Sequence, residues 1–96
     1  MEAENIADTL AEREKRYGSF EQHAEISDSI QAVMEATPKW KVLKPYQREA
    51  LRMNAHKIGR ILNGDPDYDD SWHDISGYST LVRNILRKLV RLGRPS

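Results

Sequence analysis

Apolar residues recur along the chain at spacings of three and four positions, which is the period of an α-helix. Ile6 and Leu10 form a first, weak repeat among charged residues, and this predicts a helix over residues 3–16 that ends at Gly18. A second repeat predicts a helix from about Phe20 to Ala36. Its inner stripe consists of Ile26, Ile30, Val33 and Met34.

Short signals mark where these helices begin and end. Ser19 and Gln22 have the spacing of a capping box, in which both side chains satisfy free backbone amides at a helix start. Thr37-Pro38 stops the second helix, because proline disfavours helical geometry in the residue before it. Residues 39–44 are then expected to form a loop that Trp40 anchors.

Two further helices are predicted on either side of an acidic turn. Pro45 suits the first turn of a helix, and the third helix is expected to end at Asn63-Gly64. Its apolar repeat consists of Leu51, Ala55, Ile58 and Leu62. The fourth helix is expected to begin at Asp69 or Asp70, whose charges suit a helix N-terminus, and to continue to Gly93.

These elements predict an all-α fold, a compact bundle of about four helices in a single domain over residues 1–96. Helix 3–16 is expected to be peripheral, and the long C-terminal helix would measure roughly 33 Å. Two apolar rows on that helix favour a homo-oligomer formed through it, with an ordinary intramolecular core as the alternative. The rows are Leu81-Ile85-Leu89 and Val82-Leu86-Val90.

Composition narrows the class of protein. With 39% hydrophobic and 31% charged residues, and no apolar run near the roughly 18 residues of a membrane span, we expect a soluble chain without a membrane partner. The chain has no cysteine and its start does not resemble a secretory signal, which fits the cytoplasm.

Residues 1–38 carry nine acids and three bases, and residues 39–96 six acids and twelve bases. Attraction between helices explains this division better than nucleic-acid binding, which ranks last.

Charged residues on the last two helices form the main candidate site. Asp70 and Asp74 lie on one face of the fourth helix, and Asp74 is in line with its apolar row, so partial burial is expected. Antiparallel packing would bring Lys57 or Arg60, near Asn54 on the third helix, opposite Asp74. One interpretation is a structural ion pair. The other is a pocket in which carboxylates hold a metal and Lys57 and Arg60 bind phosphate.

Other motifs give weaker signals. The alternating acids of the turn resemble an EF-hand, but Asp70 and Ser76 stand where that motif needs glycine and glutamate, so an acidic helix start explains them. The three histidines show no zinc-binding spacing. Tyr17, Gly18 and Phe20 offer either a stacking surface for a base or an aromatic-packed turn.

Three segments together resemble a group of short bacteriophage and prophage proteins. They are Arg16-Tyr17-Gly18-Ser19-Phe20, His56 to Pro66, and Asp70-Ser71-Trp72-His73-Asp74-Ile75-Ser76-Gly77-Tyr78. That group looks like a compact relative of the all-α nucleoside triphosphate pyrophosphohydrolases, the MazG-like superfamily, over about residues 12–90. In those enzymes an E-x-x-E helix and an E-x-x-D helix bind Mg²⁺, which positions the triphosphate and activates water.

The resemblance implies site residues and also shows departures from the enzymes. Asp74 matches the last aspartate of E-x-x-D, but Ser71 stands at the glutamate position and Asp70 precedes it. Asn54 and Lys57 occupy the E-x-x-E positions, so two carboxylates are missing. The resemblance therefore supports the predicted all-α fold more strongly than it supports pyrophosphohydrolase activity. Glu21 and Glu25 could replace the missing carboxylates.

Two functions follow as hypotheses. The first is a phage-type nucleotide-binding protein, a degenerate Mg²⁺-dependent pyrophosphohydrolase. Asp70 and Asp74 would be its metal ligands, Asn54, Lys57 and Arg60 would contact phosphate, and Tyr17 would lie near the base. The second is a non-catalytic helical module for protein–protein interaction, for example with a host protein.

Overall fold

The chain folds into four α-helices and one short 3₁₀ helix. The computed structural model describes residues 2–93, with side chains from Asn5 onward. The elements are α1 (Glu2–Tyr17), α2 (Phe20–Glu35), η1 (Trp40–Val42), α3 (Pro45–Asn63) and α4 (Asp69–Arg91). The predicted all-α bundle is confirmed, and the predicted helix ends agree with the observed ones to within two residues.

The residues expected to start the helices do so. The Ser19 Oγ accepts a hydrogen bond from the backbone N–H of Gln22 at 3.2 Å, which caps α2. Pro45 opens α3, and the side chain of Gln47 accepts the N–H of Lys44 at 2.9 Å. Asp69 and Asp70 lie in the first turn of α4, where carboxylates offset the positive end of the helix dipole.

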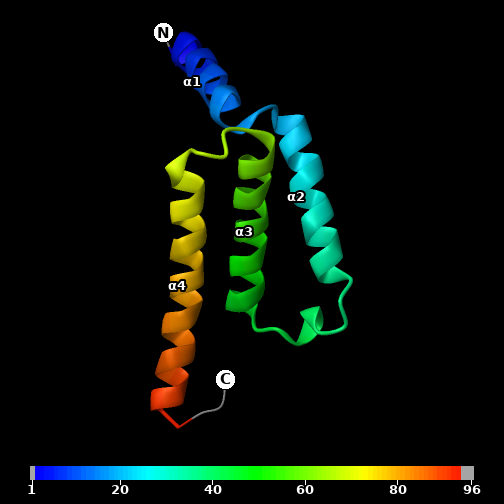
Figure 1. Ribbon diagram of the computed structural model, residues 1–96, viewed down its shortest axis with the longest axis vertical. Helices are drawn as coiled ribbons and strands as arrows, with labels where there is room; N and C mark the ends of the chain where they lie inside the picture. The colour runs from blue at the N-terminus through cyan, green and yellow to red at the C-terminus, as the bar shows by residue number, and fades with distance from the viewer. Residues whose placement is uncertain (1, 94–96) are drawn as a thin grey trace.

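Helices α2, α3 and α4 lie side by side in one layer, with α3 in the middle (Figure 1). Each runs antiparallel to its neighbour because the connections between them are short. Helix α1 projects beyond one end of this layer, and the C-terminal end of α4 extends past α3 at the other (Figure 1). The molecule is consequently long, 55 × 27 × 26 Å.

The hydrophobic core is small for a chain of this length. Among the described side chains, the only buried apolar residues are Ala50 and Ala55. The radius of gyration is 16.6 Å, against about 12 Å for a typical globular domain of this size. Large apolar side chains on every α-helix remain in solvent, among them Leu10, Val33 and Leu62, which are each at least 60% exposed.

The turn between α1 and α2 docks against the turn that follows α3. The Nδ2 of Asn63 donates hydrogen bonds to the carbonyl oxygens of Tyr17 (2.8 Å) and Ser19 (2.9 Å). Gly18 has φ +76°, and a Cβ there would overlap Asn63, whereas a Cβ on Gly64 would overlap the backbone of Arg16. This contact between the turns holds the end of α1 beside α3.

Within residues 2–93, every helix falls short of the combined length and apolarity that crossing a bilayer requires.

Candidate functional site

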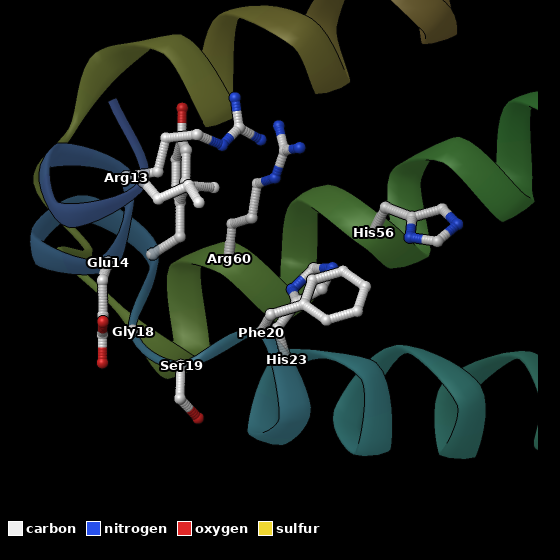
Figure 2. A pocket seen from close by; sticks show the side chains of 10 residues that line it. Arg13, Glu14, Gly18, Ser19, Phe20, His23, His56 and Arg60 are labelled. Carbon is white, nitrogen blue, oxygen red and sulfur yellow. The ribbon is translucent and has the colours of Figure 1, made fainter. Parts of the chain in front are cut away.

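A cleft of about 460 Å³ opens where the end of α1 and the start of α2 meet α3. Helix α1 and its turn supply Arg13, Glu14, Tyr17 and Gly18 among other residues, α2 supplies Phe20 and His23, and α3 supplies His56 and Arg60. Figure 2 shows their side chains around the opening. The docked turns are what bring α1 to α3, so the cleft depends on residues that are distant in sequence.

Two arginines lie over the ring of Tyr17. The guanidinium carbon of Arg60 is 4.6 Å from the ring centroid and that of Arg13 is 5.5 Å from it, so each makes a cation–π contact. Among the described residues neither arginine forms an ion pair with a carboxylate. In Figure 2 the two guanidinium groups lie near each other, and the carboxylate of Glu14 points away from them. Positive charge is therefore concentrated at the end of the cleft that holds Arg13 and Arg60.

Two histidines line the opposite part of the cleft. The rings of His23 and His56 are stacked, with centroids 5.9 Å apart. The His56 Nδ1 is 3.2 Å from the Oγ of Ser27, whereas the buried Nδ1 of His23 has no hydrogen-bond partner. Burial lowers the pKa of His23 below 6.5, and the charges of Arg60 and His56 lower it further.

Gly59 makes room for the His23 ring. A Cβ on Gly59 would lie 3.0 Å from the Nδ1 of His23, so a side chain there would push the ring away from α3. The exposed ring of Phe20 packs beside His23, with centroids 6.4 Å apart. This end of the cleft therefore offers an exposed aromatic surface next to a half-buried imidazole.

Lys57 and Asp74 are paired away from the cleft. The Nζ of Lys57 lies 2.9 Å from the Oδ2 of Asp74, which confirms the predicted ion pair between the third and fourth helices. Lys57 is buried, whereas the Asp74 side chain is 40% exposed, in agreement with the partial burial expected for it. The hydrogen bond from Lys57 lowers the pKa of Asp74 below its usual 3.8.

The other candidate residues lie in separate places. Asn54 lines a groove between α3 and α4, with Leu51 and Val82. Asp70 is exposed and accepts a hydrogen bond from the hydroxyl of Tyr68 at 3.0 Å. Over the part of the chain that the structure describes, no three histidine or acidic side chains come close enough together to hold a metal.

The structure thus divides the predicted site. Tyr17 and Arg60 come together in the cleft, Lys57 pairs with Asp74, and Asn54 and Asp70 belong to neither group. Glu21 and Glu25 are exposed on α2 and do not line the cleft.

Arg13, His23 and His56 line the cleft but were not among the site residues predicted from the sequence. Arg13 is one of five consecutive charged residues on α1, and the histidines stand 33 positions apart on different helices. Only packing brings them together. A usable signal existed for His56 and Arg60, since both lie one helical turn apart on the same face of α3.

The fold and cleft define the class as a small helical protein with a cationic, aromatic-lined cleft. The chain belongs to the DUF6378 family, described as a domain of unknown function, which matches residues 2–86. No curated protein and no solved structure matches the chain.

Proposed function

We propose that the chain binds a phosphorylated ligand of the nucleotide type in the cleft between α1, α2 and α3. The observation that carries the proposal is the pair of guanidinium groups, Arg13 and Arg60, which lie over Tyr17 without carboxylate partners among the described residues. Arginine binds phosphate oxygens through paired, charge-assisted hydrogen bonds.

The remaining cleft residues fit the rest of such a ligand. Its phosphates would lie at the arginine end, and its base would stack on the aromatic surface of Phe20 and His23. A volume of about 460 Å³ falls within the usual range for small-molecule sites. A phosphate would also offset the positive charge around His23.

The proposal concerns binding rather than hydrolysis. In the MazG-like enzymes that the sequence resembles, carboxylates hold Mg²⁺, whereas Glu14 is the one carboxylate lining this cleft. Mg²⁺ would therefore arrive with the nucleotide, held by its phosphate oxygens. The phage relationship and the MazG-like ancestry remain hypotheses, and the family match names no activity.

Calorimetric titration with inorganic phosphate, AMP, ATP and adenosine tests the proposal. We expect ATP to bind more tightly than AMP and adenosine to bind weakly, because the arginines contact phosphate. Arg60→Gln should weaken ATP binding about tenfold or more, since one charge-assisted contact contributes about 1.5 kcal/mol or more. Arg83→Gln, on the exposed side of α4, is the matched control and should bind ATP as the wild type does.

Two results would count against the proposal. If Arg60→Gln and Arg83→Gln bound ATP with equal affinity, the ligand would bind outside the cleft. If no phosphate compound bound at all, the proposed function would be wrong. Incubation with Mg²⁺ and nucleoside triphosphates, followed by assay for monophosphate and pyrophosphate, addresses hydrolysis separately.

A protein–protein interaction module without catalysis is the second candidate. The large apolar side chains in solvent on α2, α3 and α4 favour it, with a host protein as one partner to test. Co-purification with host proteins at a fixed stoichiometry, together with no nucleotide binding, would favour this candidate over the first.

A further inference from the structure

One side of the three-helix layer carries large apolar side chains that the chain itself leaves uncovered. We call this side the apolar face and define it by six residues on α2, α3 and α4. Five of them are exposed, Val33, Leu51, Ile58, Leu62 and Val90, and the sixth, Val82, is half-buried. Val33, Leu62 and Val90 are 70%, 67% and 62% exposed. On a monomeric protein, apolar surface that is continuous across three helices marks an interface.

The contacts of each helix place these residues on one side. On α3, Leu51, Ile58 and Leu62 share a face by their spacing, and Leu51 and Val82 line the same groove of about 320 Å³. On α2, Ser27 bonds to His56 on the cleft side. Val33 follows Ser27 by six residues, which turns its side chain about 240° around α2 from that of Ser27. Val33 therefore lies on the side of the layer away from the cleft.

We propose that a second copy of this chain covers the apolar face, with a two-fold axis that runs along the helices. The small core favours a permanent cover, because a chain whose only buried apolar residues in the described part are two alanines gains little from burial to offset the entropy of ordering itself. A second copy is present wherever the chain is made. The cleft lies on the opposite side and stays open in this dimer.

Charge favours this orientation of the two copies. Helix α2 carries four acids and no lysine or arginine, whereas residues 79–91 of α4 carry four bases and no acid. The two helices flank α3 on opposite edges of the layer (Figure 1). An axis along the helices places α2 of each copy against α4 of the other, whereas an axis across them would place like charges together.

The same axis sets α3 parallel to its copy. Leu51, Ile58 and Leu62 follow one another at steps of seven and four, which places them in one exposed stripe along α3. Each residue would then face its own equivalent. Val33 and Val82 both lie level with Ala50 and Leu51, as the Ser27–His56 contact and the shared groove indicate, so they would meet across the dimer.

Sedimentation equilibrium of the full chain tests the dimer first. We expect twice the 11.1 kDa chain mass, and a melting temperature that rises with protein concentration, because unfolding then includes dissociation. A monomeric mass at every concentration would overturn the proposal. A mass above that of a dimer that does not fall to the dimer mass on dilution would overturn it too.

Single-cysteine variants test the arrangement, because the chain contains no cysteine. Under mild oxidation Ile58→Cys should link to itself, and an equal mixture of Val33→Cys and Val82→Cys should give a heterodimer. Glu49→Cys is the control, since Glu49 lies two turns before His56 on the cleft side of α3 and should stay unlinked. A mixture of Ile58→Cys and Leu51→Cys that links only to each other would overturn the parallel arrangement. Circular dichroism confirms that each variant is folded.

Discussion

At the scale of single residues, Lys57 is the one charged side chain that the described structure buries. A buried ammonium group requires a partner, and Asp74 supplies it at 2.9 Å. The pair therefore occupies a residue, Lys57, that was also a candidate phosphate contact in the sequence. Arg60, three positions later, lines the cleft instead, so these two cations of α3 have different surroundings.

The Lys57–Asp74 pair should make stability depend on acid pH. The pKa of Asp74 is lowered in the folded protein, so near pH 3.8 the unfolded chain binds more protons than the folded chain does. The stabilisation by the ion pair is therefore lost as pH falls through the lowered pKa. We expect the difference in unfolding free energy between wild type and Asp74→Asn to be constant above about pH 5 and to shrink below pH 3.8. Urea unfolding over this range measures it. Asp28→Asn, at an exposed site, is the control, and a pH-independent difference would contradict the prediction.

His23 should report the positive field of the cleft. Burial lowers the pKa of His23 most, followed by the charges of Arg60 and His56, and Lys57 has a smaller effect. The folded protein therefore favours the neutral imidazole. The stability that depends on this neutral form is complete above pH 6.5 and is lost as pH falls toward the lowered pKa. Arg60→Gln removes one of these charges and should raise the pKa of His23. NMR titration of the imidazole measures the change, with Arg83→Gln as the control. An unchanged midpoint in Arg60→Gln would show that this arginine does not act on His23.

At the scale of elements, the contact between the two turns decides whether the cleft exists. Asn63→Ala removes two hydrogen bonds that join α3 to the turn between α1 and α2. We expect it to reduce the unfolding free energy by about 2 kcal/mol, near 1 kcal/mol for each bond. Chemical denaturation measures this loss, and hydrogen exchange should show that α1 opens more readily.

Asn84→Ala is the matched control for this change, because Asn84 is exposed on α4 and should be replaceable at little cost. If Asn63→Ala were as stable as Asn84→Ala, the turn contact would be incidental and the cleft would depend on other interactions.

The helices themselves could be predicted from the sequence, because their signals are local. Ser19, Pro45 and the acids at the start of α4 act within one turn of the helix that they begin. The pairing of Lys57 with Asp74 could also be predicted, since a short connection makes the third and fourth helices neighbours.

The cleft could not be predicted, because it depends on contacts between distant residues. Asn63 reaches Tyr17 across 46 positions, and His23 meets His56 across 33. Spacing rules describe one helix at a time and do not determine how α1 is placed against α3. The apolar rows of α4 were visible in the sequence, but the sequence did not show that Val90 of one row is exposed together with Leu51 and Leu62 of α3 and Val33 of α2.

At the scale of the whole molecule, the layer has two different sides. One side carries the cleft with His56 and Arg60, and the other carries the apolar face with Leu51 and Leu62. A single layer of three helices cannot enclose a core, since each helix buries only the edges that face its neighbours. Covering one side with a second copy would supply the missing core and leave one cleft per chain in solvent.

Ligand binding and dimer formation should therefore be independent of each other. By linkage, a ligand shifts a dimer equilibrium only as far as its affinity differs between monomer and dimer. The α2 and α3 residues that line the cleft lie on the side of the layer away from the apolar face. We expect saturating ATP to leave the dissociation constant of the dimer unchanged within about twofold, as measured by sedimentation of diluted protein with and without ATP. The variant Arg13→Gln/Arg60→Gln should lose ATP binding and keep the dimer mass. A shift of the dimer equilibrium by ATP would mean that the second copy reaches the cleft, and that the two sides are not separate.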